Sequence, residues 1–480
     1  MPNLSAIDLA MFLLETPERP ANVGPLLLLR PPKSASENFA ERLRANMMMY
    51  EPGPPFNYRL NMSLTRMPRV EPMASSDLAA HVHRLTLKGD GTIDELLATV
   101  CELHEKPLPR EGLLWQHYII DGLADGRVAL YGKVHHGIID GRSGVQVLAQ
   151  SMSADPADIE VRPMWVGLPA SNTAPREQSA LISVDALLGV GKAAYAVVSA
   201  GVSLFRILLA QGMRYVGLGE QALDLPYVGV PDVLTGPASS KRNFAFTTLP
   251  LQELKSLSKA TDATINDLLL AVLDGAMSRY LASQSKRPMK PIVVDMPVAL
   301  SGASGANQIA VLQFAIGKAG TTMQQRLAAI RKETARVKAV VSKNSAGALM
   351  FYSLLAHAIP TLQELLGVRR PLRLSNLVFT NPFGFTGRQY LMGAEVELAL
   401  PMAVIPAGQM LTVAALTLGD KVQLAFLGIP GAIDRISDLA KFTREAFEQL
   451  KTELQPEAGT DRAKSGSLSI ASVASSPESL

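Results

Sequence analysis

The pattern of apolar and polar residues is clearest in two adjoining runs, over residues 113–121 and 127–134. Each run alternates, as strands with two distinct faces do, and Asp125-Gly126 between them predicts a hairpin turn. Continued in register, the second strand places His136 with the inward apolar side chains and His135 on the opposite face. The inward positions are Val128, Leu130 and Val134, and the opposite ones are Tyr131 and Lys133.

Helical and extended stretches alternate through the rest of the chain. Thr92 is expected to begin a helix to His104, with Glu95 placed to complete a capping box, and Thr264 to cap a long helix that ends near Leu281. The mixture of periodicities predicts an α/β protein, and 480 residues favour two domains. Further helices are expected over 4–14, 36–49, 143–152, 251–261, 322–343, 347–367 and 433–454, and further strands over 23–29, 243–249, 291–297, 373–379, 410–416 and 421–426.

Residues 155–178 are rich in Pro, Ala and Ser and are predicted to be a linker. Residues 179–219, which follow, are the most apolar part of the chain. Their polar residues recur at heptad spacing, which leaves a wide apolar face on one helix, but charges are too frequent for a membrane span. Interdomain packing and an interfacial helix on a membrane or lipid droplet both remain open. The heptad positions are Asp185, Lys192, Ser199 and Arg206.

Composition narrows the classes of function only slightly. Hydrophobic residues make up 48% of the chain, and the net charge of +3 gives no reason to expect a nucleic-acid partner. The single Cys101 excludes an internal disulfide and a cysteine-based metal site, and suits a reducing cytoplasm. His81 and His83 could share one strand face, but no third metal ligand accompanies them, so structural histidines are expected. The first residues show no signal-peptide pattern.

The strongest candidate for a catalytic site is the stretch His135-His136, Asp140 and Gly141. Imidazole titrates near neutrality and can take a proton from a hydroxyl or thiol. A carboxylate four residues on can hold the ring or the loop in place, and a glycine lets the chain turn. A lone histidine would more simply be a core residue, but the doubled histidine with its Asp and Gly favours a general-base site.

This stretch matches the HHxxxDG motif shared by acyl-CoA-dependent acyltransferases and peptide-synthetase condensation domains. Two further motifs at matching separations make the match specific: an Asn-Asp pair, and a Ser-Asn-Val-Pro-Gly-Pro motif in which two prolines are replaced here. With these motifs, residues 4–454 resemble the bacterial wax ester synthase/diacylglycerol acyltransferase family. The matching residues are Asn266 and Asp267, then Thr380, Asn381 and Gly384, with Phe383 and Phe385 at the substituted positions.

The resemblance implies two chloramphenicol-acetyltransferase-like α/β domains, with mixed sheets and an active-site tunnel at their interface. The expected N-terminal acyltransferase domain covers residues 1–178, and an apolar helical crossover covers 179–240. The C-terminal domain is expected over 241–455, and a disordered tail over 456–480, where Ser and Ala dominate.

The resemblance also implies roles for the motif residues. His136 would be the general base, and Asp140 would organise the loop, paired with an arginine as in the wider superfamily. His135 would assist catalysis or only shape the substrate entrance. Gly137 and Gly141 would give room and turn the chain. Asn266-Asp267 either begins a helix or faces the site, and both readings stay open.

The implied activity is transfer of a fatty acyl group from acyl-CoA to a long-chain alcohol or diacylglycerol, which makes wax esters or triacylglycerol. Acyl-CoA would be a co-substrate, with no separate cofactor and no metal. The protein would be cytoplasmic and associated peripherally with the inner membrane or lipid droplets. One alternative is a condensation-domain-like acyltransferase with a carrier-protein-bound donor, which the Asn-Asp pair disfavours. The other is a non-catalytic lipid-droplet protein, which the intact His136 and Asp140 disfavour.

Overall fold

The computed structural model describes residues 6–33, 37–63, 66–73, 77–167, 202–218, 222–286, 288, 290–300, 309–317, 321–368 and 371–454. Parts of the sequence predictions concern residues outside these ranges. The heptad positions Asp185, Lys192 and Ser199 and the predicted tail 456–480 lie outside the described residues.

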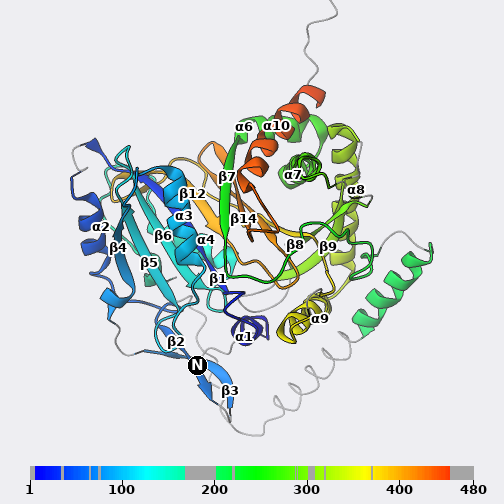
Figure 1. Cartoon of the computed structure of the whole chain (residues 1–480), viewed down its shortest axis with the longest axis horizontal. Helices are drawn as coiled ribbons and strands as arrows, with labels where there is room; N and C mark the ends of the chain where they lie inside the picture. The colour runs from blue at the N-terminus through cyan, green and yellow to red at the C-terminus, as the bar shows by residue number, and fades with distance from the viewer. Residues whose placement is uncertain are drawn as a thin grey trace, which may run out of the picture.

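A mixed six-stranded sheet forms the N-terminal half of the molecule (Figure 1). Its spatial order is β11 (Tyr390–Leu391), β12 (Ala394–Met402), β1 (Asn22–Arg30), β6 (Val128–His135), β5 (Trp115–Asp121) and β4 (Val82–Thr86). The predicted hairpin is confirmed, because β5 and β6 pair antiparallel. β4 runs parallel to β5, whereas β1 is antiparallel to both of its neighbours. Two strands of this sheet, β11 and β12, come from the C-terminal half of the chain.

A second six-stranded sheet forms the other half. Its order is β7 (Asn243–Pro250), β14 (Lys421–Gly428), β13 (Leu411–Leu418), β10 (Leu377–Thr380), β8 (Ile292–Ala299) and β9 (Ile309–Ile316). β10 runs parallel to β8 and β13, and the other pairs are antiparallel. Two mixed sheets with helices therefore confirm the predicted α/β class. A separate two-stranded ribbon joins β2 (Tyr58–Ser63) and β3 (Arg66–Pro72).

Helices cover both sheets. α2 (Phe39–Met47), α3 (Ile93–His104) and α4 (Gly141–Ser151) accompany the first sheet. α6 (Leu251–Thr261), α7 (Ile265–Ser283), α8 (Met323–Lys343), α9 (Ala346–Leu365) and α10 (Ile436–Leu454) accompany the second. α7 is apolar nearly all round, and most of its side chains are buried between α8, α10 and the rest of the core.

The ends of two helices test the predicted caps. Thr264 and Asp267 form a full capping box at the start of α7. At α3, the Thr92 side chain accepts the backbone N–H of Glu95 as predicted. The predicted return bond, from the backbone N–H of Thr92 to the Glu95 carboxylate, is wrong. The Glu95 carboxylate instead accepts the backbone N–H groups of Lys88, Gly89 and Gly91, because the loop before the helix folds back over it.

The described part of the predicted linker, residues 155–167, packs against the first sheet. Trp165 is fully buried, donates from its indole Nε1 to the Tyr50 carbonyl at 2.9 Å, and stacks on Trp115. This part is irregular, as a linker is expected to be, but a buried tryptophan ties its end to the core.

The two histidines beside β4 have structural partners. His81 Nδ1 lies 2.9 Å from the Trp115 carbonyl oxygen, and the His83 ring stacks on Tyr118.

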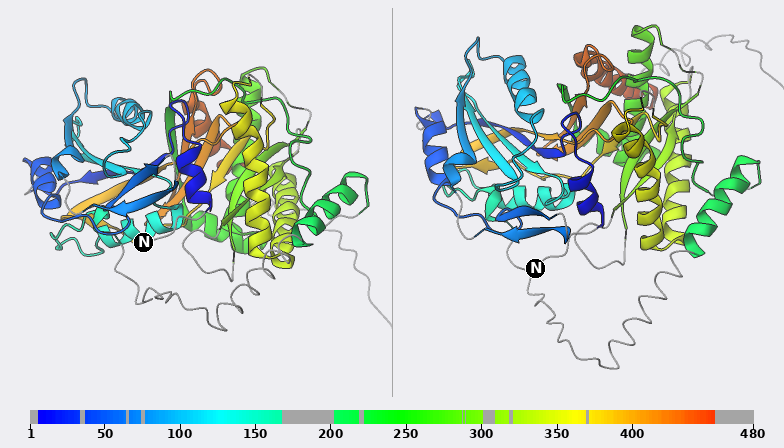
Figure 2. Two further views of the ribbon diagram at one scale, coloured as in Figure 1. Left: turned by 90° about the horizontal axis from the view of Figure 1, so that it is seen from below. Right: turned by 60° about the horizontal axis from the view of Figure 1, so that its bottom comes forward.

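The two sheets share one hydrophobic core. β12 contacts β13 and β14, and the Ala399 N–H donates to the Gln423 side chain at 2.7 Å. The same buried cluster contains Leu26 of β1 and Leu424 of β14. α1 (Ala6–Leu13) lies beside α9 where the two halves meet (Figures 1 and 2), and Arg19 forms an ion pair with Glu364 of α9 there.

Residues 202–215 form a helix that packs on α9. Gln211 is buried on its inner side and donates to the Tyr352 hydroxyl of α9 at 2.8 Å. Its outer face exposes apolar side chains, so both interpretations of this region retain support. Among the residues that the structure describes, no helix combines the length and apolarity needed to cross a membrane.

Candidate active site

A cavity of about 480 Å³ lies where the end of β6 approaches β8, β9 and α9. Most of the residues that line it are apolar, and they come from both halves of the chain. Its size and lining are those of a small-molecule site. The polar exceptions include His136 and Glu15 from the N-terminal half, and Asp295 and His357 from the C-terminal half.

His136 stands directly after β6 and lines this cavity. Its backbone N–H donates to the Ala21 carbonyl at 2.8 Å, which ties the end of β6 to the segment before β1. The side chain is partly exposed, whereas that of the preceding histidine is buried. The geometry leaves His136 at a surface that a substrate hydroxyl in the cavity can reach.

The buried neighbour, His135, is held in place by Phe12 and by the backbone of Gly137. Its ring stacks on Phe12 at 4.3 Å between ring centroids, and its Nδ1 accepts the Gly137 N–H at 3.0 Å. Because Nδ1 is an acceptor there, a neutral ring carries its proton on Nε2, which lies 3.5 Å from Glu15 Oε2. His135 is therefore built to orient the loop and the N-terminal segment.

Lys133 and His135 lie on the face of β6 opposite to the inward apolar residues, and that face is buried as well. Both are at most 2% exposed. Both faces of β6 are covered, since β6 is a central strand with a separate hydrophobic cluster on each side. Lys133 Nζ donates to the Leu103 and Lys106 carbonyls at the end of α3, and burial lowers the pKa of Lys133 to about 7.

Glu15 anchors the N-terminal segment beside the two histidines. Its carboxylate accepts the Ala21 N–H at 2.9 Å and pairs with Arg110 at 3.2 Å. Burial by itself would raise the pKa of Glu15, but His135 and these two donors lower it below the usual range. Glu15 is therefore a carboxylate at neutral pH, and the sequence analysis assigned it no role.

Gly137 has a steric reason to be glycine. A Cβ at this position would lie 2.6 Å from the Phe12 ring and 3.0 Å from His135 Nδ1. Any side chain would push the stacked Phe12–His135 pair out of place. The glycine thus lets the chain pass directly under the ring that positions the loop.

Asp140 caps helix α4. Its Oδ1 accepts the Ser143 N–H at 2.6 Å, and its backbone carbonyl accepts the Gly144 N–H. A carboxylate at an N-cap satisfies an otherwise unpaired donor. This contact supports the expected organising role, and no ion pair between Asp140 and an arginine occurs among the described residues.

Two substitutions at Asp140 separate capping from charge. Asp140→Asn keeps a good N-cap, so we expect turnover to stay within about threefold of wild type. Asp140→Ala removes the cap and is expected to cost about 1 kcal/mol of stability. Thermal unfolding and steady-state turnover check both. A stable Asp140→Asn protein without activity would show that the charge itself is needed.

The two C-terminal motifs meet each other. Asn381 Nδ2 donates to Asn266 Oδ1 at 2.7 Å, which fixes the loop after β10 to the start of α7. Asp267 is buried, completes the α7 cap with one oxygen, and accepts the Thr334 hydroxyl with the other at 2.7 Å. Asp267 thus has structural partners for both oxygens.

The loop after β10 also reaches the HHxxxDG motif. A Cβ built on Gly141 would lie 3.6 Å from the Cβ of Pro382, so the start of α4 rests against this loop. Thr380 ends β10, and Gly384 passes so close to Thr417 that a side chain has no room. The structure therefore brings the three motifs together around one junction of the two halves.

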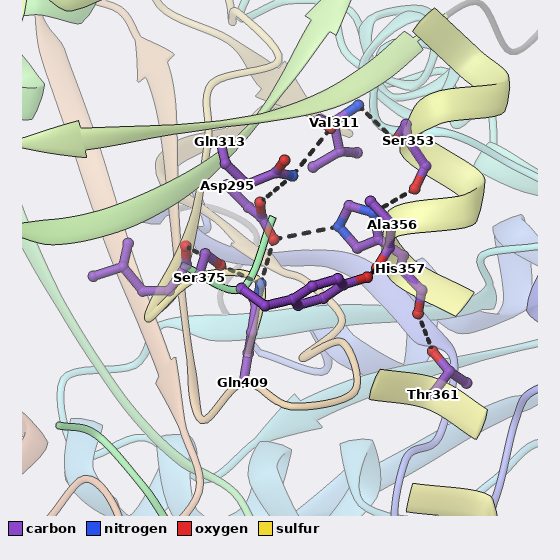
Figure 3. Close-up of polar contacts among 11 residues, drawn as sticks. Asp295, Val311, Gln313, Ser353, Ala356, His357, Thr361, Ser375 and Gln409 are labelled. Carbon is purple, nitrogen blue, oxygen red and sulfur yellow. Dashed lines mark hydrogen bonds and ion pairs between the residues drawn. The ribbon is translucent and has the colours of Figure 1, made fainter. Parts of the chain in front are cut away.

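A polar network that the sequence did not point to lies in the cavity wall (Figure 3). Asp295 of β8 is fully buried and pairs with His357 Nε2 at 3.3 Å. Gln313 and Gln409 both donate to the same carboxylate. His357 Nδ1 lies 2.7 Å from the Ser353 carbonyl, one turn earlier in α9. The only signal in the sequence is an aspartate inside an otherwise apolar strand.

The partners of His357 determine its protonation. Both ring nitrogens face oxygen acceptors, and a neutral imidazole has only one N–H to offer. Burial alone would lower the pKa of His357, but the charge of Asp295 and the two hydrogen bonds raise it above 6.5. The network thus favours the protonated form of His357 and holds its ring in place.

Comparison with solved structures defines the class of fold. The wax ester synthase/diacylglycerol acyltransferase from Marinobacter aquaeolei superposes with a TM-score of 0.71 at 22% identity, over 94% of this chain and all of the other. The epimerization domain from the third module of tyrocidine synthetase B gives 0.53 at 12% identity, over 95% and 98%. The chain thus has the two-domain fold shared by these proteins.

The sequence comparison places the chain within this class. The family model of the wax ester synthase/diacylglycerol acyltransferase catalytic domain matches residues 4–269, and the model of the C-terminal domain of the same family matches 305–451. The protein therefore belongs to the wax ester synthase/diacylglycerol acyltransferase family.

Two curated relatives match almost from end to end. A Mycobacterium tuberculosis protein described as "Probable diacyglycerol O-acyltransferase Tgs4" is 29% identical, over 96% of this chain and 98% of its own length. The O-acyltransferase WSD of Acinetobacter baylyi is 25% identical, over 93% and 96%.

Proposed function

We propose that this protein transfers a fatty acyl group from acyl-CoA to the hydroxyl of a long-chain alcohol or a diacylglycerol, with His136 as the general base. Family membership and the O-acyltransferase names of the relatives support the reaction class. The observation that carries the assignment is His136 at the wall of a mostly apolar cavity built by both halves of the chain.

The step needs one proton carrier. His136 takes the proton of the acceptor hydroxyl as the oxygen attacks the thioester carbonyl. The carbon–sulfur bond then breaks, and the CoA sulfur leaves with the proton that His136 returns. Acyl-CoA is a co-substrate in this scheme, and no separate cofactor takes part. Asp140 and His135 act through the backbone, because they hold the start of α4 and the loop after β6.

The proposal is tested by release of the CoA thiol from palmitoyl-CoA, with hexadecanol or dioleoylglycerol as acceptor. Acceptor-dependent release together with formation of the corresponding ester would support it. Acceptor-independent release would indicate thioester hydrolysis. A folded protein that releases no CoA with either acceptor would contradict it and favour a carrier-protein-bound donor or a non-catalytic role.

We also propose that the protein works at a lipid surface, through apolar faces of α9 and the 202–215 helix. On each, the exposed apolar residues recur every three or four positions, and so form one stripe. Such a stripe fits a helix lying in a membrane or droplet interface, and α9 reaches the cavity with its other face. The stripe residues are Phe351, Leu355, Ile359 and Leu362 of α9, continued by Leu366 directly after it, and Val202, Phe205, Leu209 and Met213 of the other helix, continued by Val216.

A double substitution tests this surface. Phe205 and Phe351 are 65% and 52% exposed, so aspartates should be tolerated by the fold. We expect Phe205→Asp with Phe351→Asp to weaken binding to phosphatidylglycerol-containing vesicles by about tenfold or more. Ile159→Asp, on a residue of the other half that is 75% exposed, is the control in a flotation assay. Equal vesicle binding by both proteins would contradict the proposed surface.

A further inference from the structure

The charges that line the cavity disfavour an anionic ligand. Four carboxyl side chains line it, against one arginine and the His357 ring. The arginine is already committed to Glu364 and to the Gln409 carbonyl. A free fatty carboxylate or a phosphate would therefore find no uncommitted arginine or lysine in the lining, whereas a neutral ester or alcohol needs none. The carboxyl residues are Glu15, Glu18, Asp295 and Glu364.

Within this wall, the His357–Asp295 pair is oriented with its positive end toward the cavity. The His357 side chain is 25% exposed and lines the cavity, whereas the Asp295 carboxylate behind it is fully buried. Both ring nitrogens lie within hydrogen-bond distance of protein oxygens, so the orientation of the ring is fixed. Because the charge of Asp295 and these contacts raise the pKa of His357, this part of the wall favours an electron-rich oxygen.

Ser353 adds a hydrogen-bond donor beside this ring. Its Oγ accepts the Val311 N–H at 3.0 Å, and its own hydroxyl proton is still available for donation. Among the described residues, no acceptor for that proton is found. Thr361, two turns further along α9, also lines the cavity, but its hydroxyl donates to the His357 carbonyl at 2.7 Å.

We propose that Ser353 and His357, backed by Asp295, form a second polar subsite that binds an ester carbonyl of the acyl acceptor. A diacylglycerol carries ester carbonyls near its free hydroxyl, whereas a simple long-chain alcohol carries none. The subsite therefore favours diacylglycerol-type acceptors by binding, while His136 serves both classes. This inference rests on the proposed acyl transfer and concerns how the same cavity selects its acceptor.

The test measures kcat and KM of the full chain with palmitoyl-CoA, for dioleoylglycerol and for hexadecanol. Removal of one hydrogen bond to the carbonyl in Ser353→Ala should raise the ratio of the dioleoylglycerol KM to the hexadecanol KM by about 5- to 10-fold, with kcat nearly unchanged. His357→Gln should shift the ratio in the same direction. Thr452→Val, which removes an exposed hydroxyl that donates within α10 and lies outside the cavity lining, should leave the ratio unchanged.

The outcomes separate the two proposals. A wild-type protein that turns over neither acceptor overturns the proposed function and this subsite with it. A wild-type protein that is active, but whose KM ratio is unchanged in Ser353→Ala, overturns the subsite alone. A purely structural role of the network would lower kcat and thermal stability with both acceptors and leave the ratio as it is, and this too would overturn the inference.

Discussion

Replacement of His136 by alanine is expected to lower kcat/KM for acyl transfer by about 10²–10⁴-fold, the usual loss when a positioned base is removed. The fold should survive, because the side chain borders a cavity and the backbone N–H that bonds Ala21 is kept. The measurement is acceptor-dependent CoA release, together with thermal unfolding of both proteins.

A second histidine, His83, provides a control for the loss of an imidazole. His83 lies on β4, away from the cavity lining, and stacks on Tyr118. His83→Ala should therefore retain turnover within about twofold of wild type. A folded His136→Ala protein with near-normal turnover would remove His136 from the role of base, whatever the behaviour of His83→Ala.

Gly384→Ala is expected to lower the free energy of unfolding by about 3 kcal/mol or more. A Cβ there would lie 1.9 Å from the Thr417 carbonyl oxygen, which is backbone and cannot rotate away. That oxygen also accepts the Phe385 N–H at 2.8 Å, so any shift breaks the tie between the loop after β10 and β13. Activity should fall as well, because the loop carries Asn381 and rests on α4.

Urea unfolding of Gly384→Ala beside Gly347→Ala measures this effect. Gly347 is a helical glycine at the start of α9, and a Cβ there meets nothing within 4 Å. Gly347→Ala should leave stability unchanged or raise it by up to about 1 kcal/mol, since alanine is the better helix former. If the two variants unfold at the same urea concentration, the close approach at Gly384 has no energetic consequence.

Local features of the fold were predictable because their causes are local. The alternation over residues 113–121 and 127–134, with Asp125-Gly126 between them, predicts β5, β6 and their hairpin. Thr264 and Asp267 predict the start of α7 through a cap that spans three residues. Where the outcome differed from the prediction, side-chain contacts were decisive. Trp165 inserts into the core through a nonlocal contact, and Glu95 turns to the loop just before its helix instead of closing its box.

The candidate site also has a part that could be predicted from the sequence and a part that could not. The residues of the three motifs could be named from the sequence, since each motif is a short run with a resemblance to a known family. Their assembly could not, because the contacts of Gly141 with Pro382 and of Asn381 with Asn266 join residues more than a hundred positions apart. Neighbours of this kind depend on how the sheets pack, which periodicity does not encode.

Periodicity and short-range hydrogen bonds were enough to predict the α/β class, the β5–β6 hairpin and the N-caps, because these features depend on residues a few positions apart. The motif residues could be named through their resemblance to a known family. By contrast, only the packed structure shows that β12 completes the first sheet and that both faces of β6 are buried. It also decided that Glu15 holds His135 and that Asp295 holds His357. The physical reason is that strand pairing, burial and ion pairing across the cavity depend on distance in space and hardly on separation along the chain.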